Sequence, residues 1–176
     1  KAILDQVPDD EAALKTKIGF AEPDAVGNSL QEAIQYPSLN IRGMASAWVG
    51  AKVRTIIPEA AVANLDIRLV KESDPEGLLG LIKDHIKTQG FHIIAGNEPT
   101  DDERAKYPKL ISIAEKISYT AFRTDFDTPI GHWLDAALTN TFGKSPIKIR
   151  THGGSVPISP FVNTLNVPAV AVPLVN

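Results

Sequence analysis

The stretch Ala61-Val-Ala-Asn-Leu-Asp-Ile-Arg-Leu-Val70 alternates apolar and polar side chains with the two-residue period of a β-strand. The apolar residues that share one face are Ala63, Leu65, Ile67 and Leu69. The opposite face carries Asn64, Asp66 and Arg68. We therefore expect one face of this strand to meet a core, while the other presents polar groups.

The residues around this strand predict a small α+β unit. Residues 38–43 also alternate as a strand does. Downstream, apolar residues at helical spacing predict a helix over 75–89, with Ser73 and Glu76 as its capping box. A further strand is predicted at 91–95. The order strand–strand–helix–strand is that of the second half of a ferredoxin-like sandwich, whose first strand would lie upstream of this chain.

The pattern changes towards the C-terminus. A helix is predicted over 131–142, followed by a short strand at 147–150 and a nearly continuous apolar run at 167–175. Alternating helices and apolar strands are typical of an α/β sheet that is buried on both faces. We therefore divide the chain into residues 1–125 and residues 126–176, with the second segment forming part of an α/β domain.

Two other segments complete the prediction. Residues 29–36 predict a short helix, with Ser29 as its cap and Glu32 at the capping-box position. The acidic segment 96–110 is interpreted as a solvated loop. The residues at both ends of the sequence resemble internal segments of a longer protein, so we expect a fragment.

Composition excludes several classes of site and partner. The chain has 176 residues, a net charge of -3 and no cysteine, so disulfides and thiolate metal sites are excluded. The mild negative charge gives no reason to expect nucleic acid, and no apolar run reaches the length of a membrane span. The absence of cysteine favours a reducing compartment, and we expect a cytoplasmic location, with a secreted one as the alternative because many secreted bacterial proteins also lack cysteine.

Arg68 and Asp66 share the polar face of the first strand and have two interpretations. They form either a charge pair on a solvated sheet or a site in which the Arg68 guanidinium binds a substrate carboxylate.

The segment Gly153-Gly-Ser-Val-Pro157 also has alternative interpretations. It is either a tight turn that needs glycine for its dihedrals, or a loop whose N–H groups and hydroxyl bind an oxygen of a ligand. A nucleophile–base pair of Ser155 and His152 is a third alternative, which would need an orienting group and an oxyanion hole.

Four motifs occur in an order that resembles a known family. They are Tyr36-Pro-Ser-Leu-Asn-Ile-Arg-Gly43, Gly50-Ala-Lys-Val-Arg-Thr-Ile-Ile-Pro58, Leu65-Asp-Ile-Arg-Leu-Val70 and Gly153-Gly-Ser-Val-Pro157. This series resembles the carnosinase-type branch of the carnosinase/aminoacylase/carboxypeptidase G di-zinc metallopeptidases. Bacterial dipeptidase-like members also carry the run Gly-Gly-Ser-x-Pro-Ile-Ser-Pro-Phe, which stands here at 153–161.

The resemblance implies a catalytic α/β domain that holds two zinc ions, and a ferredoxin-like lid that forms a homodimer. It implies that Arg68 binds the terminal carboxylate of a small peptide substrate, with Thr55 near it. Gly154 and Ser155, with Gly153 as a weaker member, would bind the substrate from the catalytic domain. The lid residues would act on the partner subunit's active site.

The resemblance places all of the family's zinc ligands outside this chain. We therefore expect a fragment of a dipeptidase-like exopeptidase or a related deacylase that recognises substrate, dimerises and is inactive alone. The alternative is a non-catalytic ferredoxin-like module for dimerisation or small-molecule binding.

Overall fold

The computed structural model describes residues 3–24 and 26–173. The chain forms two compact units, each built from separate segments. One unit comprises the residues up to Val70, Arg123–Ser155 and the segment from Pro168; the second comprises Lys71–Phe122 and Val156–Val167. The chain thus passes from the second unit to the first at residues 122–123, while the assignment of residues 1–125 and 126–176 to two domains remains a proposal.

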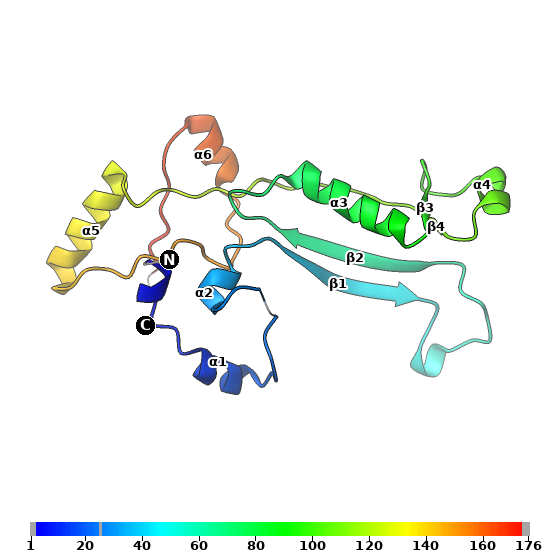
Figure 1. Cartoon of the computed structure of the whole chain (residues 1–176), viewed down its shortest axis with the longest axis horizontal. Helices are drawn as coiled ribbons and strands as arrows, with labels where there is room; N and C mark the ends of the chain where they lie inside the picture. The colour runs from blue at the N-terminus through cyan, green and yellow to red at the C-terminus, as the bar shows by residue number, and fades with distance from the viewer. Residues whose placement is uncertain (1–2, 25, 174–176) are drawn as a thin grey trace. The chain divides into compact units, whose positions relative to one another are not determined.

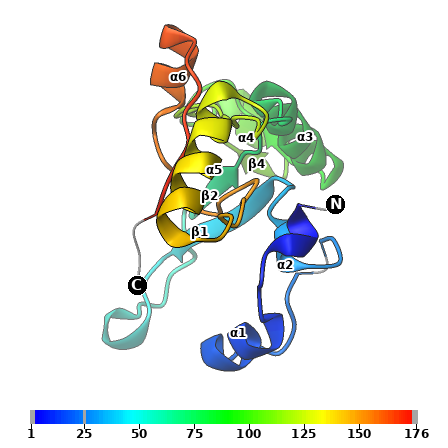
Figure 2. The same cartoon turned by 90° about the vertical axis from the view of Figure 1, so that its left-hand side faces the viewer.

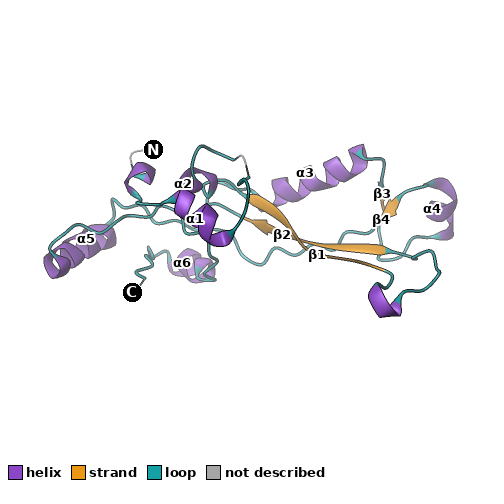
Figure 3. Cartoon of the chain, turned by 90° about the horizontal axis from the view of Figure 1, so that it is seen from below, coloured by secondary structure: helices purple, strands orange, loops and turns teal. Residues whose placement is uncertain are grey.

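The described chain contains six α-helices, two longer strands and two strands of two residues each (Figures 1 and 3). In chain order they are α1 (Glu11–Ile18), α2 (Leu30–Ala33), β1 (Ser38–Ser46), β2 (Ala61–Arg68), α3 (Pro75–Thr88), β3 (His92–Ile93), α4 (Asp101–Lys106), β4 (Leu110–Ile111), α5 (Pro129–Phe142) and α6 (Ser159–Leu165), with 3-10 turns at Leu4–Gln6 and Gly50–Lys52.

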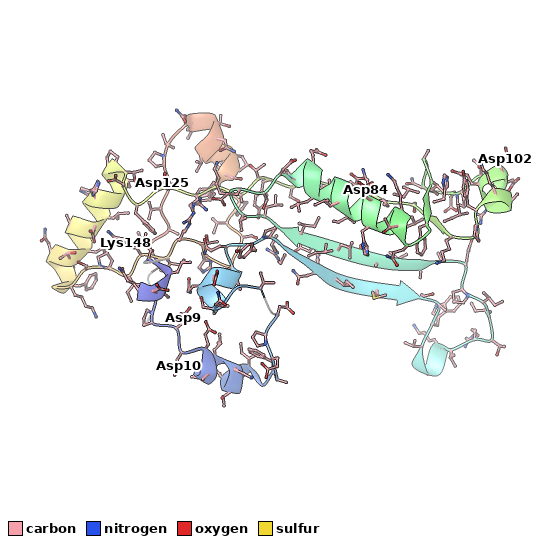
Figure 4. All side chains as sticks on the ribbon, viewed as in Figure 1. Asp9, Asp10, Asp84, Asp102, Asp125 and Lys148 are labelled. Carbon is pink, nitrogen blue, oxygen red and sulfur yellow. The ribbon has the colours of Figure 1, made fainter. Side chains whose placement is uncertain are left out.

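Side-chain caps fix the short N-terminal helices of the first unit. The Asp10 carboxylate accepts a hydrogen bond from the Ala13 N–H at 2.8 Å and so begins α1 (Figure 4). Ser29 accepts from the Glu32 N–H at 3.1 Å and begins α2, as its sequence predicts. The Gln31 amide donates to Asp9 at 2.5 Å, which links α2 to the segment before α1.

Strands β1 and β2 form an antiparallel pair (Figure 1). Ser38 lies opposite Arg68 at one end, and Ser46 lies opposite Ala61 at the other. The register shifts between Ile41 and Gly43, so Arg42 is the extra residue of a β-bulge. Because directly opposed residues share a face, this shift puts Met44 on the apolar face of the pair. The two faces of β2 therefore follow the predicted alternation.

The second unit contains α3, the β3–β4 pair, α4 and α6 (Figure 1). Figure 2 labels α3, α4, β4 and α6 from a second direction. Helix α3 confirms the helix predicted over 75–89, but its cap is Asp74 rather than Ser73. The Asp74 carboxylate accepts a hydrogen bond from the Glu76 N–H at 3.2 Å. Strand β3 pairs in parallel with β4, with His92 opposite Leu110.

Two features of the second unit differ from the sequence-based expectation. In the described residues, β3 pairs with β4 while β1 pairs with β2, so a single ferredoxin-like sheet is not confirmed. The acidic segment 96–110 contains α4, whose Thr100 and Glu103 form a complete capping box. Acidic residues in its first turn stabilise a helix N-terminus, although the same composition is typical of a solvated loop.

The C-terminal helix prediction is confirmed, whereas the strand predictions are not. Helix α5 begins at Pro129 and ends before Gly143, whose φ of 70° suits glycine. No strand occurs at 147–150 or at 167–173. The helix α6 lies between these two segments, at 159–165. Residues 174 and 175 of the apolar run lie outside the described part. A strand needs a hydrogen-bonded neighbour, and this part of the described chain provides none.

Little of the described chain is buried. Ile94 is the only buried hydrophobic residue among residues 3–24 and 26–173. The apolar face of β1 and β2 stays exposed, including Leu39, Ile41 and Met44. Over the same residues, no helix has both the length and the apolarity that a membrane crossing requires.

Candidate functional site

Arg68 and Ser155 lie in contact in the first unit, although 87 positions separate them in the sequence. Arg68 ends β2, and Ser155 belongs to the loop that follows α5. The Arg68 Nη1 group donates a hydrogen bond to Ser155 Oγ at 2.5 Å. The structure therefore joins two of the residues that the sequence selects for substrate binding.

A carboxylate holds the other edge of the Arg68 guanidinium. Asp66 Oδ2 lies 2.6 Å from Arg68 Nε, and Asp66 Oδ1 lies 3.8 Å from Arg42 Nη1. The Asp66 side chain is 25% exposed, compared with 54% for Arg68 and 69% for Arg42. Asp66 is thus the most enclosed member of the group and lies between two cations.

The glycine loop is shaped by His152. The Gly154 N–H donates to His152 Nδ1 at 3.0 Å. Because Nδ1 accepts this hydrogen bond, it carries no hydrogen in this contact. A Cβ atom at Gly154 would lie 2.8 Å from His152 Cε1, closer than carbon atoms pack. A Cβ atom at Gly153 would meet no atom within 4 Å. A side chain at Gly154 would therefore require the exposed His152 ring to move, whereas Gly153 has open space.

The partners of Ser155 and His152 bear on the alternative of a nucleophile–base pair. The described contacts give Ser155 a guanidinium neighbour and give His152 a backbone N–H. A guanidinium is always charged and does not accept a proton, so it cannot act as the base. This geometry favours ligand binding by Ser155.

Thr55 lies away from this group within the chain. It belongs to the connection between β1 and β2, which follows Ser46 and precedes Ala61. Arg68 lies at the opposite end of β2, about 23 Å along the strand from Ala61. The expected proximity of Thr55 to Arg68 is not found within one chain.

The sequence selects Arg68 and Ser155 but does not reveal the roles of Arg42 and His152. Arg42 carries no distinguishing signal in the sequence, because only the pairing of β1 with β2 reveals that it is a bulged residue. The sequence allows His152 to be a base, and the structure instead shows its ring accepting a hydrogen bond from the Gly154 N–H.

A second polar cluster lies around β3 in the other unit. The His92 ring stacks on Tyr107 with centroids 3.7 Å apart, and His92 Nε2 lies 3.4 Å from the Glu103 carboxylate. The backbone N–H of Thr100 lowers the pKa of Glu103, with smaller contributions from the Thr100 hydroxyl and His92. These contacts hold α4 against β3.

No metal centre forms from the described residues. Within residues 3–24 and 26–173, no three His, Cys, Asp or Glu side chains converge so that they could hold a metal ion. His132, for example, contacts a single carboxylate, that of Asp127, at 2.7 Å. The described donors therefore do not fit a di-zinc centre.

Matches to known proteins from the family, sequence and structure comparisons are consistent with one another. Residues 3–93 match the peptidase dimerisation domain of the M20 family. Over 58 residues the chain is 31% identical to the Cys-Gly metallodipeptidase dug1 of Schizosaccharomyces pombe, a match that covers 33% of this chain and 12% of that protein. The crystal structure of the M20 family metallo-carboxypeptidase Sso-CP2 from Sulfolobus solfataricus shares the fold, with a TM-score of 0.66 and 24% identity.

The match to the Sulfolobus structure covers 94% of this chain and 34% of that one. The chain thus spans about a third of the length of that relative, and the matched segment is a smaller share of the dipeptidase.

Proposed function

We propose that this chain, which belongs to the M20 family of metallopeptidases, supplies dimerisation and substrate-carboxylate recognition to a dipeptidase-like exopeptidase. The contact between Arg68 and Ser155 carries this proposal. A guanidinium offers a planar set of donors that matches a carboxylate, and a serine hydroxyl can donate to the same group. The substrate is a small peptide with a free terminal carboxylate.

The names of the relatives support this substrate class. One relative is named for Cys-Gly, a dipeptide, and the other is named as a metallo-carboxypeptidase. Gly153, Gly154 and Thr55 complete the proposed substrate-binding set, with Thr55 acting in the partner subunit's site. That assignment agrees with the position of Thr55 in the β1–β2 connection, at the end of β2 opposite to Arg68 within one chain.

Dimerisation is supported by the family match and by exposed apolar residues. The β1–β2 connection carries Val49 and Ile57, which are 85% and 95% exposed. The free energy falls when another surface covers exposed apolar side chains of this kind. We propose a homodimer that forms through the matched domain.

The proposed enzyme carries two zinc ions, which polarise the scissile carbonyl and activate a water molecule when bound. Because the described residues do not fit such a centre, we assign its ligands to other parts of the enzyme. Residues of this chain bind and orient the substrate, and we expect the chain alone to be inactive.

Arg68→Ala in the complete enzyme tests the proposal. We expect KM for a free-acid dipeptide to rise by about tenfold or more, because a hydrogen bond to a charged group contributes about 1.5–3 kcal/mol. KM for the corresponding dipeptide amide should stay constant. Arg104→Ala is a matched control, because Arg104 is 53% exposed and lies 3.9 Å from Glu98. An unchanged KM for the free acid in Arg68→Ala would remove Arg68 from the site.

A further inference from the structure

The guanidinium of Arg68 has two different edges, and Asp66 occupies one of them. Asp66 Oδ2 contacts Nε at 2.6 Å, while Ser155 Oγ accepts from Nη1 at 2.5 Å. A guanidinium has five N–H donors, so the contacts in the described part of the chain leave Nη2 and the second hydrogen of Nη1 for a ligand. An incoming carboxylate therefore meets Arg68 end-on, at its Nη edge.

We propose that Asp66 is a positioning residue for substrate recognition, which holds Arg68 by Nε and directs its Nη edge to the substrate carboxylate. This inference rests on the proposed function of Arg68. The Asp66 carboxylate is well suited to this role, because it is the least exposed member of the group and lies on the same strand face two residues before Arg68. A charge-assisted contact at this distance fixes a side chain that is otherwise long and flexible.

The bulge at Arg42 supports the same arrangement. Arg42 Nη1 lies 3.8 Å from Asp66 Oδ1, so the second carboxylate oxygen also faces a cation. Two positive charges around one negative charge leave a net positive charge of one in the group. Asp66 can thus hold Arg68 without abolishing the attraction of the group for a carboxylate.

Ser155 extends the site on the Nη side. Its Oγ accepts from Arg68, so its own O–H hydrogen is available to donate to the ligand. Donation by a hydroxyl whose oxygen already accepts from a cation is strengthened, because successive hydrogen bonds in a chain polarise one another. The recognised carboxylate would therefore receive donors from Arg68 and Ser155 together.

Asp66→Asn in the complete enzyme tests this role, because it keeps the shape of the side chain and removes its charge. We expect KM for a free-acid dipeptide to rise roughly tenfold, with kcat unchanged, because Arg68 is less well oriented. KM for the dipeptide amide should stay constant, and Asp66→Glu should restore part of the affinity for the free acid. Asp84→Asn is the matched control: Asp84 pairs with Lys87 on the exposed side of α3 (Figure 4).

Several outcomes would overturn the inference. A lower KM for the free acid would mean that Asp66 acts by repelling the substrate, and equal effects on acid and amide would indicate a structural role only. If Asp66→Asn fails to fold, Asp66→Glu alone tests the inference. A change of KM for the free acid but not for the amide supports the positioning role, and an unchanged KM for the free acid overturns it. If Arg68→Ala raises KM and Asp66→Asn does not, only this inference fails. If Arg68→Ala itself changes nothing, the proposed function fails and this inference fails with it.

Discussion

Gly154→Ala should weaken substrate binding through His152. The new Cβ atom would lie 2.8 Å from Cε1 and 2.9 Å from Nδ1 of that ring. The imidazole must then move, and the hydrogen bond from the Gly154 N–H, now 3.0 Å long, is lost. A hydrogen bond of this kind contributes about 0.5–1.5 kcal/mol net, which corresponds to roughly a 2- to 13-fold rise in KM when the loop binds the substrate.

The assay is steady-state hydrolysis of a free-acid dipeptide by the complete enzyme, in a double-mutant cycle with His152→Ala. His152→Ala alone removes the same hydrogen bond and should raise KM by a similar factor. In the His152→Ala background the ring that would clash is absent, so Gly154→Ala should add almost nothing. Strictly additive effects of the two substitutions would refute the reasoning, because they would show that Gly154 acts independently of His152.

Two further predictions concern stability. The Thr100 N–H lowers the pKa of Glu103, so the stabilisation from this carboxylate is complete above its ordinary pKa of 4.5 and is lost as the pH falls through the lowered value. The free energy of unfolding, measured against pH, should show this loss. In Glu103→Gln this pH dependence should be absent. On α3, Gly80→Ala should stabilise the protein by about 0.5–1 kcal/mol, because no atom lies within 4 Å of the new Cβ. Gly77→Ala should lack this gain, because its Cβ would lie 2.5 Å from Asp74 Oδ2 and disturb a cap that contributes about 1 kcal/mol; equal urea midpoints for the two variants would contradict this account.

Local elements were predictable wherever neighbouring residues decide them. The alternation of 61–70 corresponds to β2, and the helices predicted over 75–89 and 131–142 correspond to α3 and α5. Each depends on periodicity or on a cap within a few residues. The strands predicted at 147–150 and 167–175 are not found in the described residues, because apolar composition does not supply the neighbouring strand that a sheet requires.

The sequence by itself determined the two faces of β2, and so placed Asp66 and Arg68 side by side, because side chains two residues apart on a strand point the same way. It also identified the Gly-Gly-Ser loop as a candidate binding segment. Only the tertiary structure decided that Ser155 lies against Arg68, that Arg42 is bulged towards Asp66, and that Thr55 lies at the far end of the strand pair. These relations depend on strand register and on chain segments far apart in sequence, which local patterns do not encode.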